Sequence, residues 1–351
     1  MKKSLIALAA LAAVSAASAQ STLNMTGTFS PNYNSAKTEA ANGNSRTANT
    51  FENSNIATSR VLFTGSEDLG GGTKAIFLYE MDFDSTSKDT SPLSGEIYVG
   101  LTGGFGSLKV GVPNSPTLTT QSGRSGFTSK IGGGRGAFAL SGTTVTRQND
   151  AVRYDTPTFG GFSAAVNYTP KVSAAAVNQG FVAAAETTAI TDVGGFYTNG
   201  PIAAGISNYQ QKNVVDQTTL FASYTMGAAK VTLGLHTRDN KKLVADAPAN
   251  TAAQVVGDAL GKSTGYNVAL NYSLTPAITL IGNIARTNDK TAYNRDLQLA
   301  AIGAEYALSK RTSLHARYVS TKRDNVDGAV AASAGVPTAQ KTTLVGIVHN
   351  F

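Results

Sequence analysis

One stretch of the chain carries basic side chains and no acidic ones. Residues 97–149 contain no Asp or Glu, but five basic residues occur there: Lys109, Arg124, Lys130, Arg135 and Arg147. Fixed positive charges along a narrow aqueous passage attract anions and repel cations, so they select ions without a binding pocket. A charge run more often decorates a solvated exterior. The stretch therefore indicates anion passage only if its residues line a channel.

The alternation of the flanking segments places several charges on one face. Successive side chains of a β-strand point to opposite faces. Arg60 and Arg147 have the opposite parity to Val61 and Val152, and Glu80 lies on the polar face of its own segment. Parity assigns further arginines to the polar face, namely Arg153, Arg238 and Arg317. We therefore expect these side chains to face water inside a barrel rather than lipid outside it.

Alternating segments of this kind recur along the whole chain and predict its strands. Seven connectors between them are short: 67–72, 103–106, 157–161, 199–201, 226–229, 274–277 and 308–311. Eight are longer and polar: 34–54, 85–93, 113–146, 171–188, 212–216, 239–263, 287–295 and 323–340. Seven short turns and eight loops join sixteen strands, and an even number places both termini on the short-turn side. The sequence predicts an all-β fold, a transmembrane antiparallel 16-stranded β-barrel, although the alternation is poor in residues 296–307.

The connector 112–146 is far longer than an ordinary loop. Loops of more than ~12–15 residues are usually functional or disordered. A barrel of sixteen strands has a lumen that its own side chains cannot fill, so a loop can fold inward and narrow it. The alternative is a surface loop rich in Gly and Ser. The third loop, 112–146, is the candidate pore constriction.

Both ends of the chain fit export to an outer membrane. Lys2 and Lys3, the apolar run 5–14 and Ala17-Ser18-Ala19 predict a signal peptide over residues 1–19. Residues 20–351 would form the barrel, with a charge reduced from +7 to +5 by loss of the two lysines (27 Lys+Arg against 22 Asp+Glu). The last residues alternate as a lipid-facing strand and end at Phe351, which we expect to close the barrel and direct its assembly.

Composition excludes several other classes of function. The chain has no Cys and no Trp, but it has 36 Gly, 13 Tyr and 14 Phe, which suit short strands, tight turns and aromatic girdles. The three histidines lie far apart, so neither a metal nor a catalytic site is expected. Residues 257–263 resemble a phosphate loop but lack its first glycine, since Val256 stands there. We expect no cofactor, no enzymatic activity and no nucleic-acid partner.

Several motifs, in order and correctly spaced, resemble those of one family. They are Ser59-Arg60 with residues 65–75, residues 98–111, residues 154–162, residues 308–312, and the terminal Gly346-Ile-Val-His-Asn-Phe351. The chain resembles the trimeric general porins of Gram-negative outer membranes, of the beta-proteobacterial type. The resemblance implies a homotrimer in contact with outer-membrane lipid and lipopolysaccharide. It also implies a water-filled channel for small hydrophilic solutes and anions, with Arg60, Glu80 and Arg147 at its constriction.

The departures from the family fall close to that constriction. Val112 and Pro113 follow Gly111 where the family commonly has arginine, and the usual basic side chain near Gly95 and Glu96 is missing. A substrate-specific channel is the nearest alternative, but such channels line their path with aromatic rings. The constriction loop holds only Phe127 and Phe138, and Phe105 precedes it. An outer-membrane phospholipase or protease, or a plugged structural barrel, are more distant alternatives.

Overall fold

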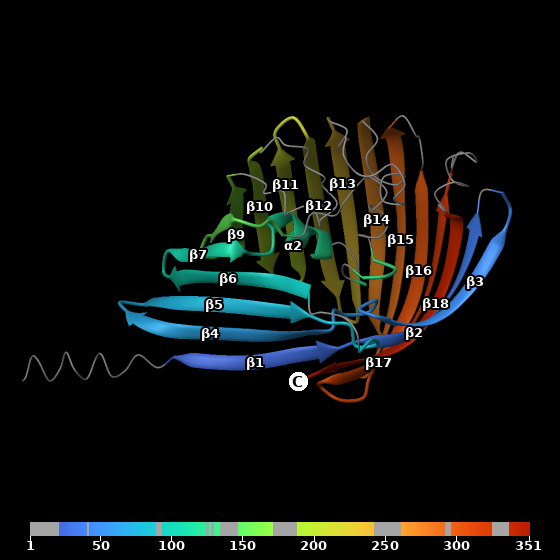
Figure 1. The fold of residues 1–351 in the computed structure, drawn as a ribbon, viewed down its shortest axis with the longest axis horizontal. Helices are drawn as coiled ribbons and strands as arrows, with labels where there is room; N and C mark the ends of the chain where they lie inside the picture. The colour runs from blue at the N-terminus through green and yellow to red at the C-terminus, as the bar shows by residue number, and fades with distance from the viewer. Residues whose placement is uncertain are drawn as a thin grey trace, which may run out of the picture.

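The protein is described from a computed structural model (Figure 1). It describes residues 21–40, 42–88, 93–123, 126–127, 130–133, 147–170, 188–241, 261–291, 296–324 and 337–351. Within these ranges no helix has the length and hydrophobicity needed to cross a membrane.

Eighteen β-segments make up the wall. They are β1 (Thr22–Phe29), β2 (Pro31–Ala40), β3 (Ser45–Asn53), β4 (Arg60–Gly70), β5 (Thr73–Asp82), β6 (Leu93–Gly103), β7 (Gly106–Val112), β8 (Ala151–Asp155), β9 (Phe162–Thr169), β10 (Ile190–Asn199), β11 (Ile202–Gln211), β12 (Val215–Met226), β13 (Ala229–Asn240), β14 (Gly261–Ser273), β15 (Ile278–Thr291), β16 (Leu297–Ala307), β17 (Thr312–Arg323) and β18 (Pro337–Asn350). β1 and β2 continue each other across Ser30, and β3 and β4 are two parts of one strand interrupted at residues 54–59. Eighteen segments less these two continuations give sixteen strands.

The sixteen strands close into a ring of antiparallel neighbours. β18 pairs with β17 on one side and with β1 and β2 on the other. Where the ring closes, the backbone N–H groups of Gly27 and Phe351 each donate to the other residue's carbonyl at 3.1 Å. Closure leaves no strand edge facing lipid, where an unpaired backbone group is costly. The predicted 16-stranded antiparallel barrel is confirmed.

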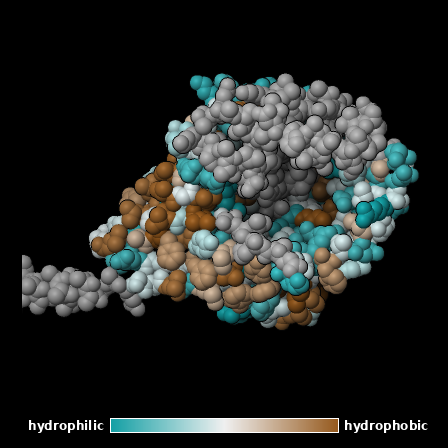
Figure 2. Space-filling view, viewed as in Figure 1, coloured by the Kyte–Doolittle hydropathy of each residue, from teal (hydrophilic) through white to brown (hydrophobic). Residues whose placement is uncertain are grey.

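The strands alternate between an apolar outer face and a polar inner face. On β14 the outward Tyr266, Val268 and Tyr272 are 40–51% exposed, whereas the inward Asn267 is 2% exposed. Figure 2 shows hydrophobic residues gathered over the outer side of β1 and β4–β7, at the left of the view. All seven predicted short turns lie between strands, but several longer connectors were predicted too long. The segment 34–54 is mostly strand, in β2 and β3.

β16 explains why residues 296–307 alternate poorly. Its inner face carries apolar residues, Leu297, Leu299 and Ala301, which are 1–5% exposed and pack against Phe127. Its outer face is apolar as well, since Ile302 is 65% exposed. A strand that is covered on its inner face by another apolar segment has no reason to alternate. The alternation of residues 296–307 is poor because apolar side chains, rather than water, cover the inner face of β16.

The small side chains Thr26, Gly27, Thr28 and Gly346 of the first and last strands would permit close packing against another copy of the chain. Gly27, Thr28 and Gly346, expected to pack wall to wall with another copy, are already occupied within the chain. The Phe351 ring fills the space over Gly27, and Ile56 fills the space over Gly346. Thr28 donates to Asn350 Oδ1 at 2.8 Å. Thr26 alone of the four remains exposed.

The Phe351 ring packs where the barrel closes, and we expect it to stabilise that closure. Phe351 packs over Gly27 and lies 5.9 Å, between ring centroids, from Phe29. Phe351→Ala is expected to cost on the order of 1 kcal/mol, because the ring is half-buried. Gly27→Leu should be worse, because its side chain displaces the ring. Heat-modifiable electrophoretic mobility measures the folded fraction.

Gly282→Leu is the matched control, because Gly282 faces open space on β15. If the Gly27 and Phe351 variants both fold like the Gly282 variant, the ring has no part in closure.

Candidate functional site on the inner wall

A buried carboxylate on the inner wall binds two arginines. Arg60 begins β4, Glu80 lies near the end of β5, and Arg147 precedes β8. Glu80 is 2% exposed; its Oε1 accepts from Arg60 Nη1 at 2.8 Å, and its Oε2 lies 3.4 Å from Arg147 Nη2. The structure therefore brings together the three wall residues that parity placed on one face.

A β-bulge at Glu80 and the absence of a side chain at Gly95 allow the Glu80 carboxylate to point toward these arginines. Tyr79 is opposite Ile97 and Met81 is opposite Ser94, so Glu80 alone faces two residues of β6, Gly95 and Glu96. The Glu96 N–H donates to Glu80 Oε2 at 3.0 Å. The Glu80 side chain lies over Gly95, where a Cβ would collide with its carboxyl group. Bulges often redirect a side chain next to a functional site.

A second carboxyl group belongs to the same cluster. Asp82 lies directly across from Arg60 in the β4–β5 register and interacts electrostatically with Glu80, Arg60 and Arg147. The cluster thus holds two arginines and two acidic residues. Asp82 has the same parity as Glu80 on β5, but alternation does not indicate the height at which its side chain lies on the wall.

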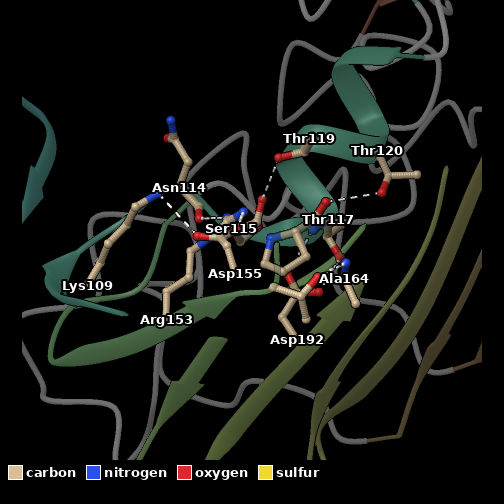
Figure 3. A network of polar contacts seen from close by, with 12 residues as sticks. Lys109, Asn114, Ser115, Thr117, Thr119, Thr120, Arg153, Asp155, Ala164 and Asp192 are labelled. Atoms are coloured by element: carbon tan, nitrogen blue, oxygen red, sulfur yellow. Dashed lines mark hydrogen bonds and ion pairs between the residues drawn. The ribbon is translucent and has the colours of Figure 1, made fainter. Parts of the chain in front are cut away.

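The long segment after β7 is attached to the wall where it begins (Figure 3). The Asn114 N–H and Nδ2 donate to the two carboxylate oxygens of Glu96 at 2.9 and 2.7 Å. Arg153 Nη1 donates to the Asn114 carbonyl, while Arg153 Nη2 lies 2.6 Å from Asp155 Oδ1. Lys109 Nζ is 3.2 Å from Asp155 Oδ2. Two cations therefore share one carboxylate beside the start of this segment.

The helix α2 (Pro116–Gly123) follows and is capped twice. Ser115 Oγ accepts from the Leu118 N–H at 3.0 Å, which is a local N-cap, and Pro116 suits the first helical position. Asp192, from β10, supplies the second cap: its carboxyl oxygens accept from the Thr117 N–H at 3.0 Å and from Thr117 Oγ1 at 2.8 Å (Figure 3). Asp192 is fully buried. A wall residue therefore holds the helix.

The described residues beyond α2 contact the opposite wall. Phe127 packs into the apolar inner face of β15–β17, with Arg317 Cζ 4.9 Å from its ring centroid. Asn283 Nδ2 donates to the Gly132 carbonyl at 2.8 Å, and the Ile131 N–H donates to the Asn55 carbonyl at 3.2 Å. Lys130 Nζ donates to Thr58 Oγ1 at 2.7 Å, two residues before Arg60.

The predicted site residues have different positions in the structure. The cluster consists of Arg60, Glu80 and Arg147, and Lys130 lies beside it. Arg153 donates a hydrogen bond to the Asn114 carbonyl. Arg238 and Arg317 are on the inner face as predicted, 4% and 5% exposed. Arg124 and Arg135 lie outside the described residues. Reasoning from sequence missed the anchors Glu96 and Asp192, whose only signal was an acidic residue at an inward position.

Comparisons with known proteins agree with this geometry. A family model described as Gram-negative porin matches residues 7–326. "Outer membrane porin protein 32" of Delftia acidovorans is 31% identical, and the alignment covers 100% of both chains. "Major outer membrane protein P.IB" of Neisseria meningitidis serogroup B is 30% identical over 89% of this chain and 91% of that protein. The solved "Anion-selective porin from Comamonas acidovorans" has a TM-score of 0.75 at 24% identity, covering 95% of this chain and 100% of that one.

Proposed function

Because the chain belongs to the Gram-negative porin family, we propose that its channel prefers anions and is narrowed by the segment 112–146. The protein is an outer-membrane porin, a β-barrel channel of the Gram-negative outer membrane. The proposal concerns the finer properties of that channel: its charge preference, its narrowest part and its assembly.

The charge balance near the Glu80 cluster carries the proposal of anion preference. Arg60 and Arg147 face Glu80 and Asp82, so these four residues together are close to neutral. The surroundings add three cations, Lys130 beside the cluster with Lys109 and Arg153 near Asp155. Two carboxylates, Asp155 and Glu96, offset them, which leaves one positive charge in excess. Residues 97–149 add Arg124 and Arg135 without any acidic residue. We therefore expect a moderate preference for anions.

Ionic strength tests this proposal. Charges are screened over ~10 Å at 0.1 M salt and over ~3 Å at 1 M. The reversal potential across a planar bilayer should therefore favour chloride in dilute potassium chloride and approach zero preference in concentrated salt. A preference that does not change with salt would point to pore size rather than to wall charge.

The contacts of the long segment support its role as the constriction. Its described parts touch the inner faces of β9–β12 through α2 and of β15–β17 through Phe127. A segment attached to two distant parts of the wall crosses the lumen between them. Passing solutes would then meet Lys130 from the segment and Arg60, Glu80 and Arg147 from the wall.

We also propose that the protein is a homotrimer embedded in outer-membrane lipid. Family membership is the main support, and the outer wall adds two adjoining apolar grooves. One of about 780 Å³ lies on β2, β3 and β15–β18, and one of about 720 Å³ lies on β14–β18. Phe51, at one of them, is 73% exposed. Cross-linking or native mass spectrometry in mild detergent should give three times the monomer mass. A monomer with full conductance would contradict this assembly.

A further inference from the structure

The interruption between β3 and β4 forms a turn on the inside of the barrel, residues 54–59, here called the inner turn. Ile56, near its centre, is 5% exposed and packs against Leu344 and Val348. Both belong to the buried face of β18, which alternates with its exposed outward residues. The Ile56 side chain also covers Gly346, where a Cβ would collide with it. Like the long segment after β7, the inner turn therefore lies against the inner wall.

Serine side chains give the inner turn a defined shape. Ser59 Oγ accepts from the Ser30 N–H at 2.9 Å, and Ser30 Oγ accepts from the Ala57 N–H at 3.0 Å. Ser54 has a φ of 63°, in the left-handed region, and its Oγ accepts from the Ser59 N–H at 3.0 Å. Short polar side chains that bond to nearby backbone groups stabilise turns. The inner turn is therefore an ordered element rather than a frayed strand end.

The inner turn contacts the long segment at two adjacent residues. The Asn55 carbonyl accepts from the Ile131 N–H at 3.2 Å, and Thr58 Oγ1 accepts from Lys130 Nζ at 2.7 Å. The Ile131 side chain packs against both the apolar cluster on β15–β17 and the one on β18. These contacts place the Lys130 ammonium group two residues from the start of β4.

Arg317 joins the inner turn and the long segment from the wall. Its Nη1 donates to the Ile131 carbonyl at 3.1 Å and to the Asn55 carbonyl at 3.4 Å. Its Cζ is 4.9 Å from the Phe127 ring centroid, and its Nη2 is 3.8 Å from Glu305 Oε1. Arg317 is 5% exposed, so the two segments cover most of its charge. A planar guanidinium can donate in several fixed directions at once, whereas a lysine ammonium on its flexible stem cannot.

We propose that Arg317 is a positioning residue of the channel, which together with the inner turn holds Lys130 beside Arg60. The inference rests on the proposed constriction by the long segment and gives the far end of that segment its support. The parity of β17 predicts Arg317 only as an inward charge. Its donors are instead directed to backbone carbonyls, so its effect on anion preference comes from the placement of Lys130 rather than from its own charge.

Two substitutions of Arg317 separate position from charge. Arg317→Lys keeps the charge and loses the planar donors, whereas Arg317→Met loses both. We expect both variants to show more open-channel noise and a similar fall, by roughly twofold, in the chloride-to-potassium permeability ratio in dilute salt, because one partly exposed charge is worth little in water. Arg286→Met is the control, because Arg286 is outward on β15 and should affect neither quantity.

The absence of cysteine from the sequence allows the lost contact to be restored covalently. Asn55→Cys and Ile131→Cys place thiols on two backbones that share a hydrogen bond, and disulfides span Cα separations of ~4.4–6.8 Å. In the Arg317→Met background, the oxidised pair should return both noise and permeability ratio to the wild-type level. Reduction by dithiothreitol should abolish that rescue, so each channel is its own control. If Arg317→Met does not fold, Ile56→Ala loosens the same support, and its excess noise should be suppressed by the same disulfide.

The possible failures are distinguishable. A wild-type permeability ratio and noise in Arg317→Lys, with a changed ratio in Arg317→Met, would show that Arg317 acts through its charge. An oxidised pair that forms, as its mass shows, but does not rescue the current would exclude positioning through this contact. If Asp192→Ala, at the other end of the long segment, alters the current and neither Arg317 variant does, only the role of Arg317 is excluded. If none of the three alters it, the constriction itself is excluded, and the role of Arg317 with it.

Discussion

Replacing Arg60 and Arg147 together by glutamate is expected to shift the reversal potential toward cations. The change turns a cluster of two cations and two acidic residues into four acidic groups at one height of the wall. A free-energy difference of about 1.4 kcal/mol between anion and cation passage changes their ratio tenfold, and we expect at least that change. Trimer yield should be unaffected, because lumen substitutions alter selectivity more than the paired backbone of the wall.

Removing the acidic partner of the two arginines tests the same cluster. Glu80→Gln removes the carboxylate that both arginines share at 2.8 and 3.4 Å, so the channel should become more anion-selective. Lys37→Glu with Lys310→Glu is a charge control: Lys37 is outward on β2 and Lys310 is exposed in the turn before β17. The assignment of the cluster is wrong if this control moves the reversal potential as far as the arginine pair does.

Replacing Asp192 by alanine is expected to loosen the constriction. The substitution leaves the Thr117 N–H without its acceptor, and an unsatisfied buried group costs about 1–3 kcal/mol. The Thr117 hydroxyl can still donate to Ser207 Oγ of β11 at 3.2 Å, so the attachment of the helix to the wall is weakened rather than lost. We expect larger mean conductance and more open-channel noise in single-channel recordings, with unchanged heat stability of the barrel.

Two further substitutions define that effect. Asp192→Asn keeps one acceptor oxygen and should give an intermediate phenotype. Asp216→Ala removes a carboxylate from the outer face of nearby β12 and should change neither conductance nor noise. If the Asp192→Ala variant shows wild-type conductance and noise, the position of the segment 112–146 does not depend on Asp192.

The architecture was predictable because its signals are local. A short turn such as 199–201 depends on a few adjacent residues, and alternation in β5 or β14 depends only on which face meets lipid. These rules gave the strand number and placed Arg60, Glu80 and Arg147 on the inner face. β16 failed the same test because Phe127, about 170 residues earlier in the chain, covers its inner side.

The arrangement of the site was less predictable because it depends on height along the barrel. Parity states which face a residue occupies, but neither the strand tilt nor the bulge at Glu80 can be read from alternation. Asp82 and Asp192 were inward by parity, yet their partners, Arg60 across the register and Thr117 at a distance of 75 residues, follow only from the closed register. The same holds for Lys130, whose contact with Thr58 joins distant segments.

The reversal potential of the wild-type channel in a dilute potassium chloride gradient shows whether the charges on the inner wall select anions. We expect stepwise, ohmic conductance increments and a potential whose sign shows chloride to be more permeant than potassium. Stepwise conductance with potassium favoured would contradict the charge assignment while leaving the barrel intact. A bilayer that stays silent after insertion of folded protein would contradict the channel itself.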